Sequence, residues 1–207
     1  MDKGKFIVFE GIDGCGKGTI LEMVYKWLLG KKINKNRIVV TREPWTSKPG
    51  EKTREIIKSE NNPVSRANEL LDLYLNDRKE HLEKEINPSL EQGKIVLCDR
   101  YKYSTVAYQA AQGINIRQLV EQNKGFLSPD LSIILDLEEY IALERISVDK
   151  KRGSKEMFEK KEFLVKVREL FVRMPELFPE ENIRLIEASK SREEVFKETK
   201  KLLKEFI

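Results

Sequence analysis

The segment from Phe6 to Thr19, FIVFEGIDGCGKGT, restricts the possible folds of this chain more than any other stretch. Its first apolar residues predict a short buried strand, and a helical spacing of apolar residues begins just after Lys17. The loop between them, from Gly11 to Lys17, satisfies the pattern G-x-x-x-x-G-K. Glycines let backbone N–H groups curl around an anion, the helix N-terminus adds a positive end, and the lysine reaches terminal phosphates. The segment therefore predicts a phosphate-binding loop rather than an ordinary glycine-rich turn.

One position departs from the general pattern. The serine or threonine that normally follows the lysine is Gly18, so no hydroxyl stands there for Mg²⁺, and Thr19 comes one residue late. A Mg²⁺ ion at this loop is expected to depend on nucleotide phosphates, water and carboxylates, which suits an ion that gives up its water reluctantly.

Further apolar runs predict four more strands, over residues 38–41, 95–98, 131–137 and 183–186. Helical patterns separate them, over residues 51–58, 63–82, 104–112, 138–148, 158–173 and 191–206. This alternation is typical of one mostly parallel, doubly wound α/β sheet with helices on both faces and its ligand site at the C-terminal edge. At 207 residues the chain is long enough for one such domain, residues 1–207, and short for two.

Composition indicates the compartment and the kind of ligand. Lys and Arg total 39 against 35 Asp and Glu, a net charge of +4 that favours a small anionic ligand over an extended nucleic-acid footprint. The two cysteines match no disulfide framework or metal-binding spacing, as expected in a reducing cytosol. No apolar stretch reaches the length of a membrane span, and the first residues are unlike a signal peptide. We therefore expect a cytoplasmic protein that binds neither nucleic acid nor membranes.

The ends of the predicted strands supply candidate ligands. The second strand ends at Arg42-Glu43-Pro44, where proline takes the chain out of the sheet. The third ends at Asp99-Arg100, an acid that can hold Mg²⁺ or its waters and an arginine that can bind a second phosphate. Tyr74 and Arg78 are four residues apart on one helical face and could hold a nucleobase, although the pattern alone favours packing and a surface salt bridge.

Other positions allow two interpretations. Residues 149–156 place four basic side chains around a glycine and predict either a mobile flap that closes over phosphates or a solvated helix end. Thr105 and Tyr108 share a helical face with Tyr101, yet without further context they would be cap and core residues. His81, the only histidine, lies mid-helix among charges and is expected at the surface or in packing rather than in catalysis.

Several motifs together resemble the thymidylate kinase family of P-loop nucleoside monophosphate kinases. They are Gly11–Lys17, Thr41-Arg-Glu-Pro44, Asp77-Arg78, and Asp99-Arg-Tyr with Ser104 and Ala107-Tyr-Gln109. The phosphate loop is shared by many enzymes, whereas the combination with D-R-Y-x-x-S-x-x-A-Y-Q is much more specific. The resemblance implies a P-loop NTPase fold with a short flap, ATP and dTMP as substrates, Mg²⁺ as cofactor, and a homodimer.

The resemblance also implies roles for individual residues. Tyr74 matches the aromatic residue that stacks on thymine, and Arg78 matches the arginine that hydrogen-bonds the base. Thr105 matches the residue that reads the base edge, Tyr108 the residue that packs under the sugar, and Arg100 the residue that grips the monophosphate. The ATP-binding loop would consist of Gly11, Ile12, Asp13, Gly14, Cys15, Gly16, Lys17, Gly18 and Thr19.

The motifs place further residues at the site. Glu43, Pro44 and Ser104 are expected beside the substrate. Asp99 is expected at the metal, and Asp13 near the acceptor, with some relatives using this acid at Mg²⁺.

Family members supply a catalytic arginine from the phosphate loop or from the flap. The loop here has Gly14 and Cys15 in that region, so Arg152 in the flap is the expected residue and Arg145 the reserve. Two departures stand out: Gly18, which adenylate kinases share in the sequence K-G-T, and Trp45-Thr46, which replaces the glycine pair of bacterial members. The second departure bears on the shape of the monophosphate pocket.

The expected reaction transfers the γ-phosphoryl group of ATP to the 5′-phosphate of dTMP, giving dTDP and ADP. Alignment and charge neutralisation by Lys17, Arg100, Arg152 and Mg²⁺ would supply the catalysis. A deoxynucleoside kinase is one rival, but it needs a base to activate a hydroxyl and leaves Arg100 without a purpose. A nucleotide switch or nucleic-acid-associated ATPase is another, although the sequence has neither an N-K-x-D motif nor a long basic face.

Overall fold

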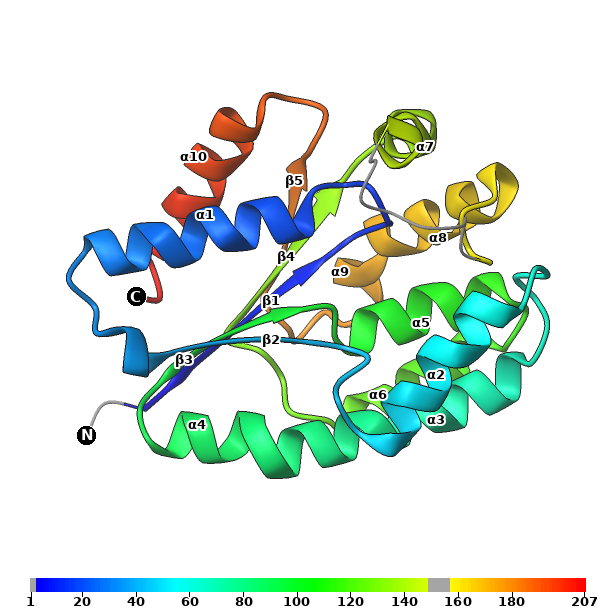
Figure 1. Cartoon of the computed structure of the whole chain (residues 1–207), viewed down its shortest axis with the longest axis horizontal. Helices are drawn as coiled ribbons and strands as arrows, with labels where there is room; N and C mark the ends of the chain where they lie inside the picture. Colours follow the sequence, from blue (N-terminus) through cyan, green and yellow to red (C-terminus); the bar gives the residue numbers. More distant parts are fainter. Residues whose placement is uncertain (1–2, 149–156) are drawn as a thin grey trace.

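A five-stranded sheet organises the computed structural model, which describes residues 3–148 and 157–207. The strand order is β2-β3-β1-β4-β5, and all four neighbouring pairs are parallel, which confirms the predicted doubly wound α/β sheet (Figure 1). The strands are β1 (Lys5–Glu10), β2 (Ile38–Arg42), β3 (Ile95–Asp99), β4 (Leu131–Asp136) and β5 (Ile183–Glu187).

Helices connect the strands by crossovers on both faces of the sheet. The longer ones are α1 (Lys17–Gly30), α2 (Lys48–Ser59), α3 (Ala67–His81), α5 (Lys102–Ala111), α7 (Glu139–Val148), α8 (Lys161–Val172) and α10 (Arg192–Leu203). The shorter ones are the 3₁₀ turn η1 (Lys35–Arg37), the π-helical turn η2 (Leu82–Ile86), α4 (Asn87–Glu91), α6 (Ile116–Lys124) and α9 (Met174–Leu177).

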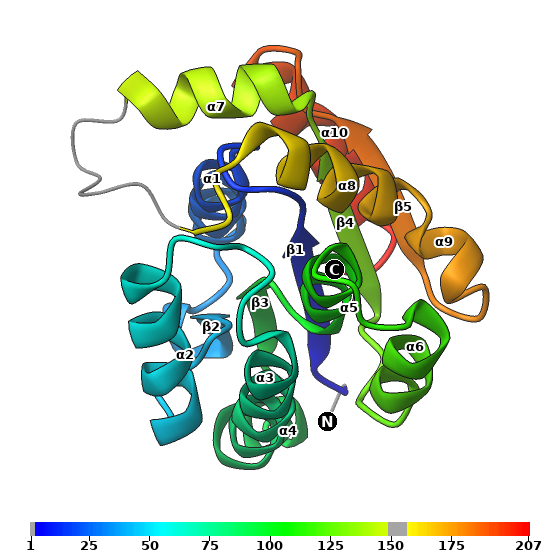
Figure 2. The same ribbon diagram turned by 90° about the vertical axis from the view of Figure 1, so that its right-hand side faces the viewer.

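The helices form a layer on each face of the sheet. Helices α1 and α10 pack together on one face, and α4, α5 and α8 lie on the other (Figure 1). Helices α2 and α3 lie side by side, as the turned view also shows (Figure 2). The central strands β1, β3 and β4 are buried almost throughout because helices cover both of their faces.

The register of the strands assembles one edge of the sheet. Phe9 of β1 pairs with Asp99 of β3, and Asp99 pairs in turn with Arg42 of β2. The phosphate loop, the Asp99-Arg100 segment and the Arg42–Pro44 segment therefore leave the sheet next to one another, as the crossover rule predicts.

Some predicted helix boundaries were wrong. The helix expected from Pro63 begins at Ala67, the helix expected from Phe158 begins at Lys161, and α5 begins two residues before the expected Ser104. Pro175 opens the short helix α9 instead of only ending the preceding one, because proline fits the first turn of a helix. Helices α4 and α6 were not expected, since five- and nine-residue elements carry little periodic signal.

Candidate active site

The phosphate loop follows β1 and closes on its own lysine. Gly11, Gly14 and Gly16 all have positive φ, and a Cβ at Gly14 would lie 2.5 Å from the Ala142 carbonyl oxygen. Only glycine fits such a backbone without strain. The Lys17 Nζ donates to the carbonyl oxygens of Gly11 and Ile12, each at 3.0 Å, so its positive charge is held within the loop.

A cavity of about 560 Å³ opens over this loop. Seven of the nine predicted ATP-binding residues, from Asp13 to Thr19, line this cavity. Ile12 is buried, and its carbonyl oxygen accepts a hydrogen bond from Lys17. Besides Lys17, five cationic side chains line the cavity: Arg42, Arg100, Arg145, Lys190 and Arg192. This concentration of positive charge suits a polyphosphate.

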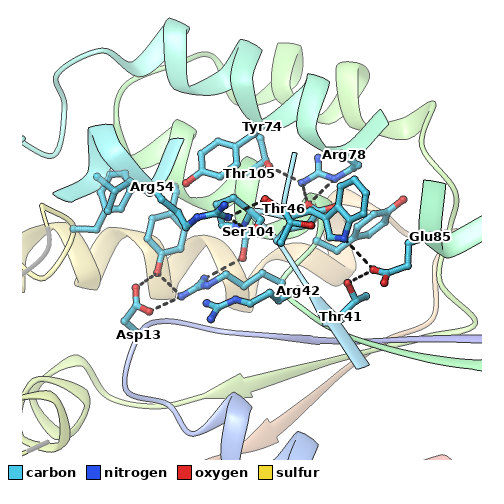
Figure 3. Close-up of a pocket in the computed structure, with 18 of the residues that line it drawn as sticks. Asp13, Thr41, Arg42, Thr46, Arg54, Tyr74, Arg78, Glu85, Ser104 and Thr105 are labelled. Carbon is cyan, nitrogen blue, oxygen red and sulfur yellow. Dashed lines mark hydrogen bonds and ion pairs between the residues drawn. The ribbon is translucent and has the colours of Figure 1, made fainter. Parts of the chain in front are cut away.

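A second cavity, of about 780 Å³, adjoins the first. All of the predicted substrate residues line it: Glu43, Pro44, Tyr74, Arg78, Arg100, Ser104, Thr105 and Tyr108. Asp13, Arg42 and Arg100 line both cavities and therefore mark where the two meet. In Figure 3, Arg42 extends toward the end of the pocket where Asp13 lies, while Tyr74, Arg78 and Thr105 gather away from that end.

Arg100 is fixed at the junction by its backbone and by four polar groups. It has φ 70°, an uncommon value for a residue with a side chain. Its guanidinium donates to Asp13 Oδ1 at 2.7 Å, Ser104 Oγ at 3.1 Å, the Gly11 carbonyl at 3.3 Å and Tyr108 Oη at 3.4 Å. Burial raises the pKa of Tyr108 well above its ordinary value, so the phenol keeps its proton and donates to Asp13 Oδ2 at 3.0 Å.

The opposite end of the second cavity is built around Arg78. Its Nε and Nη2 donate to Glu43 Oε2 at 3.0 and 2.6 Å, Nη1 donates to Asn123 Oδ1 at 2.8 Å, and Nη2 donates to Thr105 Oγ1 at 2.9 Å. The side chain is only 1% exposed, so the alternative of a surface salt bridge is wrong. An arginine bound so tightly offers a rigid donor to a ligand.

Asp99 is the candidate metal ligand that the structure leaves most available. It lines the first cavity, and its Oδ1 is buried without a hydrogen-bond partner among the described residues. Such an orphaned carboxylate oxygen fits a magnesium ion or one of its waters. Both oxygens of Asp13, by contrast, already accept hydrogen bonds from Arg100 and Tyr108. In the described parts of the chain, no group of three or more His, Cys, Asp or Glu side chains could hold a metal unaided.

The expected catalytic arginine, Arg152, and the flap at 149–156 lie outside the described residues. The reserve residue, Arg145, does line the first cavity, where its Nη2 donates to the Ala188 carbonyl at 3.2 Å.

The sequence patterns assigned no specific role at the site to three groups near the cavities. Arg42 is exposed at the junction and forms no ion pair with a described residue. Glu10 is fully buried beneath Arg100 and Ser104. His81, expected at the surface or in packing rather than in catalysis, is buried and stacked on Trp45, and it is hydrogen-bonded between two carboxylates. Its i, i+4 spacing to Glu85 was the available signal.

A parallel α/β sheet with a phosphate loop at its carboxyl edge and two adjoining, cation-lined cavities defines a class: the P-loop kinases that join a nucleotide donor to a second phosphorylated ligand. Similarity to known proteins identifies one family within this class of kinases. The family model for thymidylate kinase matches residues 9–199, and the chain belongs to the thymidylate kinase family.

Individual relatives agree with this assignment over their full length. The chain is 39% identical to a probable thymidylate kinase of Pyrococcus horikoshii, covering 98% of this chain and 97% of that protein. It is 36% identical to a thymidylate kinase of Clostridium novyi, covering 99% and 100%. The crystal structure of thymidylate kinase from Ehrlichia chaffeensis superimposes with a TM-score of 0.75 at 29% identity, covering 98% of this chain and 99% of that one.

Proposed function

We propose that this protein transfers the γ-phosphoryl group of ATP to dTMP, giving dTDP and ADP. The observation that carries the proposal is the pair of cavities meeting at Asp13, Arg42 and Arg100, one over the phosphate loop and one ending at Arg78. Two phosphorylated ligands bound in these cavities would point their phosphates at each other. Such alignment is the largest part of catalysis in phosphoryl transfer.

The donors at the Arg78 end favour a base with a carbonyl group. Four of the five N–H groups of Arg78 bind described residues, which leaves one N–H of Nη1 for a ligand. Thr105 Oγ1 accepts from Arg78, so its own hydrogen is available as a second donor. Thymine presents the O4 acceptor at its edge, where cytosine presents an amino donor. A cytosine base would leave buried donors unpaired, a costly mismatch.

The remaining pocket residues would hold the ring and the sugar. Tyr74 is half-buried on α3 in the same cavity and would stack on the base. Tyr108 is packed edge-on against Phe158 at 5.1 Å and is fixed further by Asp13. A wall this rigid would disfavour the extra hydroxyl of a ribose.

The charges at the junction would be used for the phosphates. The positive charge of Arg100 is already offset by Asp13 at 2.7 Å, so a dianionic acceptor needs a further cation. We assign this role to Arg42, and the transition-state contact to Arg152 of the flap. Lys17 and the loop N–H groups would bind the donor phosphates.

We further propose that Mg²⁺ is bound through Asp99, with water and nucleotide phosphates completing its coordination, because Gly18 has no hydroxyl to contribute. When bound, the ion would neutralise charge on the donor phosphates.

The family resemblance also motivates proposals of a homodimer in the cytoplasm. Size-exclusion chromatography with light scattering would test the first, and a monomer at the working concentration would refute it. The structure contains no helix, in the parts it describes, that is both long and apolar enough to cross a membrane.

The proposed function is tested with a panel of acceptors, supplied with ATP and Mg²⁺. We expect diphosphate from dTMP, less from dUMP, and very little from dCMP or from the nucleoside thymidine. Turnover of thymidine in preference to dTMP would support the rival nucleoside kinase. Salt-dependent DNA binding without monophosphate kinase activity would support the rival ATPase.

A matched pair of variants addresses the base-reading role. Thr105→Val keeps the shape of the side chain and removes both its donor and its acceptor for Arg78 Nη2, so we expect a KM for dTMP raised by about tenfold with the KM for ATP unchanged. The control variant is Lys79→Gln, which changes an exposed side chain and should leave both KM values unchanged. Val106→Thr, on the same helix as Thr105, is not used because Val106 is buried.

A further inference from the structure

His81 is enclosed by hydrogen-bonding groups from two other segments. It is the last residue of α3 and is fully buried, with its ring stacked on Trp45 at 5.2 Å and an interplanar angle of 15°. Nδ1 lies 3.3 Å from Glu43 Oε1. On the other side of the ring, Nε2 lies 2.8 Å from Thr41 Oγ1 and 3.2 Å from Glu85 Oε2.

The hydroxyl hydrogen of Thr41 determines which groups around His81 donate and which accept. Thr41 has one hydroxyl hydrogen, and it is donated to Glu85 Oε2 at 2.5 Å. Both groups facing Nε2 are therefore acceptors, so this nitrogen must donate. Nδ1 faces a carboxylate oxygen, so it must donate as well. A neutral imidazole has only one N–H, whereas an imidazolium has the two that this geometry requires.

The surrounding charges agree with a cation at this position. Glu43, in the segment after β2, and Glu85, in η2, contact the ring. Asp77 of α3 interacts with the ring electrostatically, while its own oxygens accept from Trp45 and Ser47. Arg78 is the one cation of this group. Three carboxylates against one guanidinium leave a negative excess around the buried ring, with Glu85 itself 33% exposed. Burial raises the pKa of Asp77, and a positive charge on His81 acts in the opposite direction. A second cation lowers the cost of burying these carboxylates.

We propose that His81 is a buried imidazolium that positions Glu43, and through it Arg78, at the nucleobase end of the second cavity. Glu43 Oε2 accepts hydrogen bonds from Nε and Nη2 of Arg78, and Glu43 Oε1 faces Nδ1 of His81. The Trp45 indole N–H donates to Glu85 Oε2 at 3.0 Å, so the carboxylate that faces Nε2 of His81 is itself held in place. His81 is thus a positioning residue, and the proposal rests on the role proposed above for Arg78 in base recognition.

The protonation state can be observed directly because the chain has one histidine. Nitrogen-detected NMR of the untagged, ¹⁵N-labelled protein reports the protonation of each ring nitrogen with no need for assignment. We expect two protonated nitrogens at neutral pH. One protonated and one unprotonated nitrogen there would overturn the proposal, whatever the enzyme assays show.

Kinetics test whether the cation positions Arg78. In His81→Gln we expect the KM for dTMP to rise by about tenfold, with kcat and the KM for ATP within about twofold of wild type. Lys79→Gln, an exposed change on the same helix, is the matched control and should keep the wild-type KM for dTMP.

Arg78→Lys separates failure of this proposal from failure of the proposed function. An unchanged KM for dTMP in Arg78→Lys would refute base recognition by Arg78. A raised KM for dTMP in Arg78→Lys but a wild-type KM in His81→Gln would refute only the positioning by His81. Equal losses in kcat and in the affinities for both substrates would show a merely structural role and would also overturn the proposal.

Discussion

Glu10 is the clearest case in which one buried side chain links pH to the stability of this protein. It ends β1 and is fully buried, and its Oε1 accepts from the backbone N–H groups of Tyr101 at 2.8 Å and Ser104 at 3.1 Å. Its Oε2 accepts from Ser104 Oγ at 2.5 Å. The carboxylate therefore satisfies the N–H of Tyr101, the residue before α5, and shares the N–H of Ser104 with the Tyr101 carbonyl.

Burial outweighs these hydrogen bonds and raises the pKa of Glu10 from 4.5 to about 7. Because the pKa is higher in the folded state, the folded protein binds more protons than the unfolded chain between these two values. The free energy of unfolding must then fall as the pH rises through this window and level off above it. The difference between a pKa of 4.5 and one of about 7, at about 1.36 kcal/mol for each pH unit, corresponds to a loss of about 3 kcal/mol in the free energy of unfolding.

The substitution Glu10→Gln removes the titration and keeps an acceptor oxygen for the two backbone N–H groups. We expect the free energy of unfolding of wild type to fall, relative to that of the variant, by about 3 kcal/mol in total, most of it between about pH 5 and pH 8. Urea denaturation at a series of pH values measures this difference, and all other titrating groups cancel in it. Glu187→Gln, an exposed glutamate at the end of β5, is the matched control and should show little change. Parallel pH profiles for wild type and Glu10→Gln would refute the reasoning.

Four further predictions concern the site. Arg152→Ala should lower kcat by about a thousandfold or more while changing the KM for dTMP little, and equal losses in both would reject its catalytic role. Tyr74→Ala should raise the KM for dTMP by about tenfold in steady-state assays, and an unchanged value would remove Tyr74 from the pocket. Asp99→Asn should raise the Mg²⁺ concentration needed for half-maximal rate by about tenfold, whereas an unaltered Mg²⁺ titration would place the ion elsewhere. Gly14→Ala introduces a Cβ 2.5 Å from the Ala142 carbonyl oxygen at positive φ, so ATP affinity measured by calorimetry should fall by about tenfold or more, and wild-type affinity would contradict the close approach.

Patterns along the chain predicted the five parallel strands and the phosphate loop because both depend on local features. Apolar runs bounded by turn residues indicate buried strands, and the spacing from Gly11 to Lys17 indicates an anion site. The motif resemblance also identified eight of the residues that line the second cavity. Helix starts were predicted less well, because caps such as Arg66, with φ 55°, carry no side-chain capping signal.

The tertiary structure decided what each predicted side chain faces. Periodicity shows that Tyr74 and Arg78 share a helical face, but it does not show that Glu43, Asn123 and Thr105 meet the guanidinium there. Those partners come from segments 27 to 45 residues away, and they converge because β2, β3 and β1 pair in parallel register.

By itself, then, the sequence determined the kind of sheet, the position of the phosphate loop and the family to which the chain is related. Only the tertiary structure placed His81 between Glu43 and Glu85, joined the two cavities at Arg42, and buried Glu10 beneath α5. The physical reason is that burial and hydrogen bonding at these positions depend on contacts between distant segments, which the order of residues along one helix or strand does not specify.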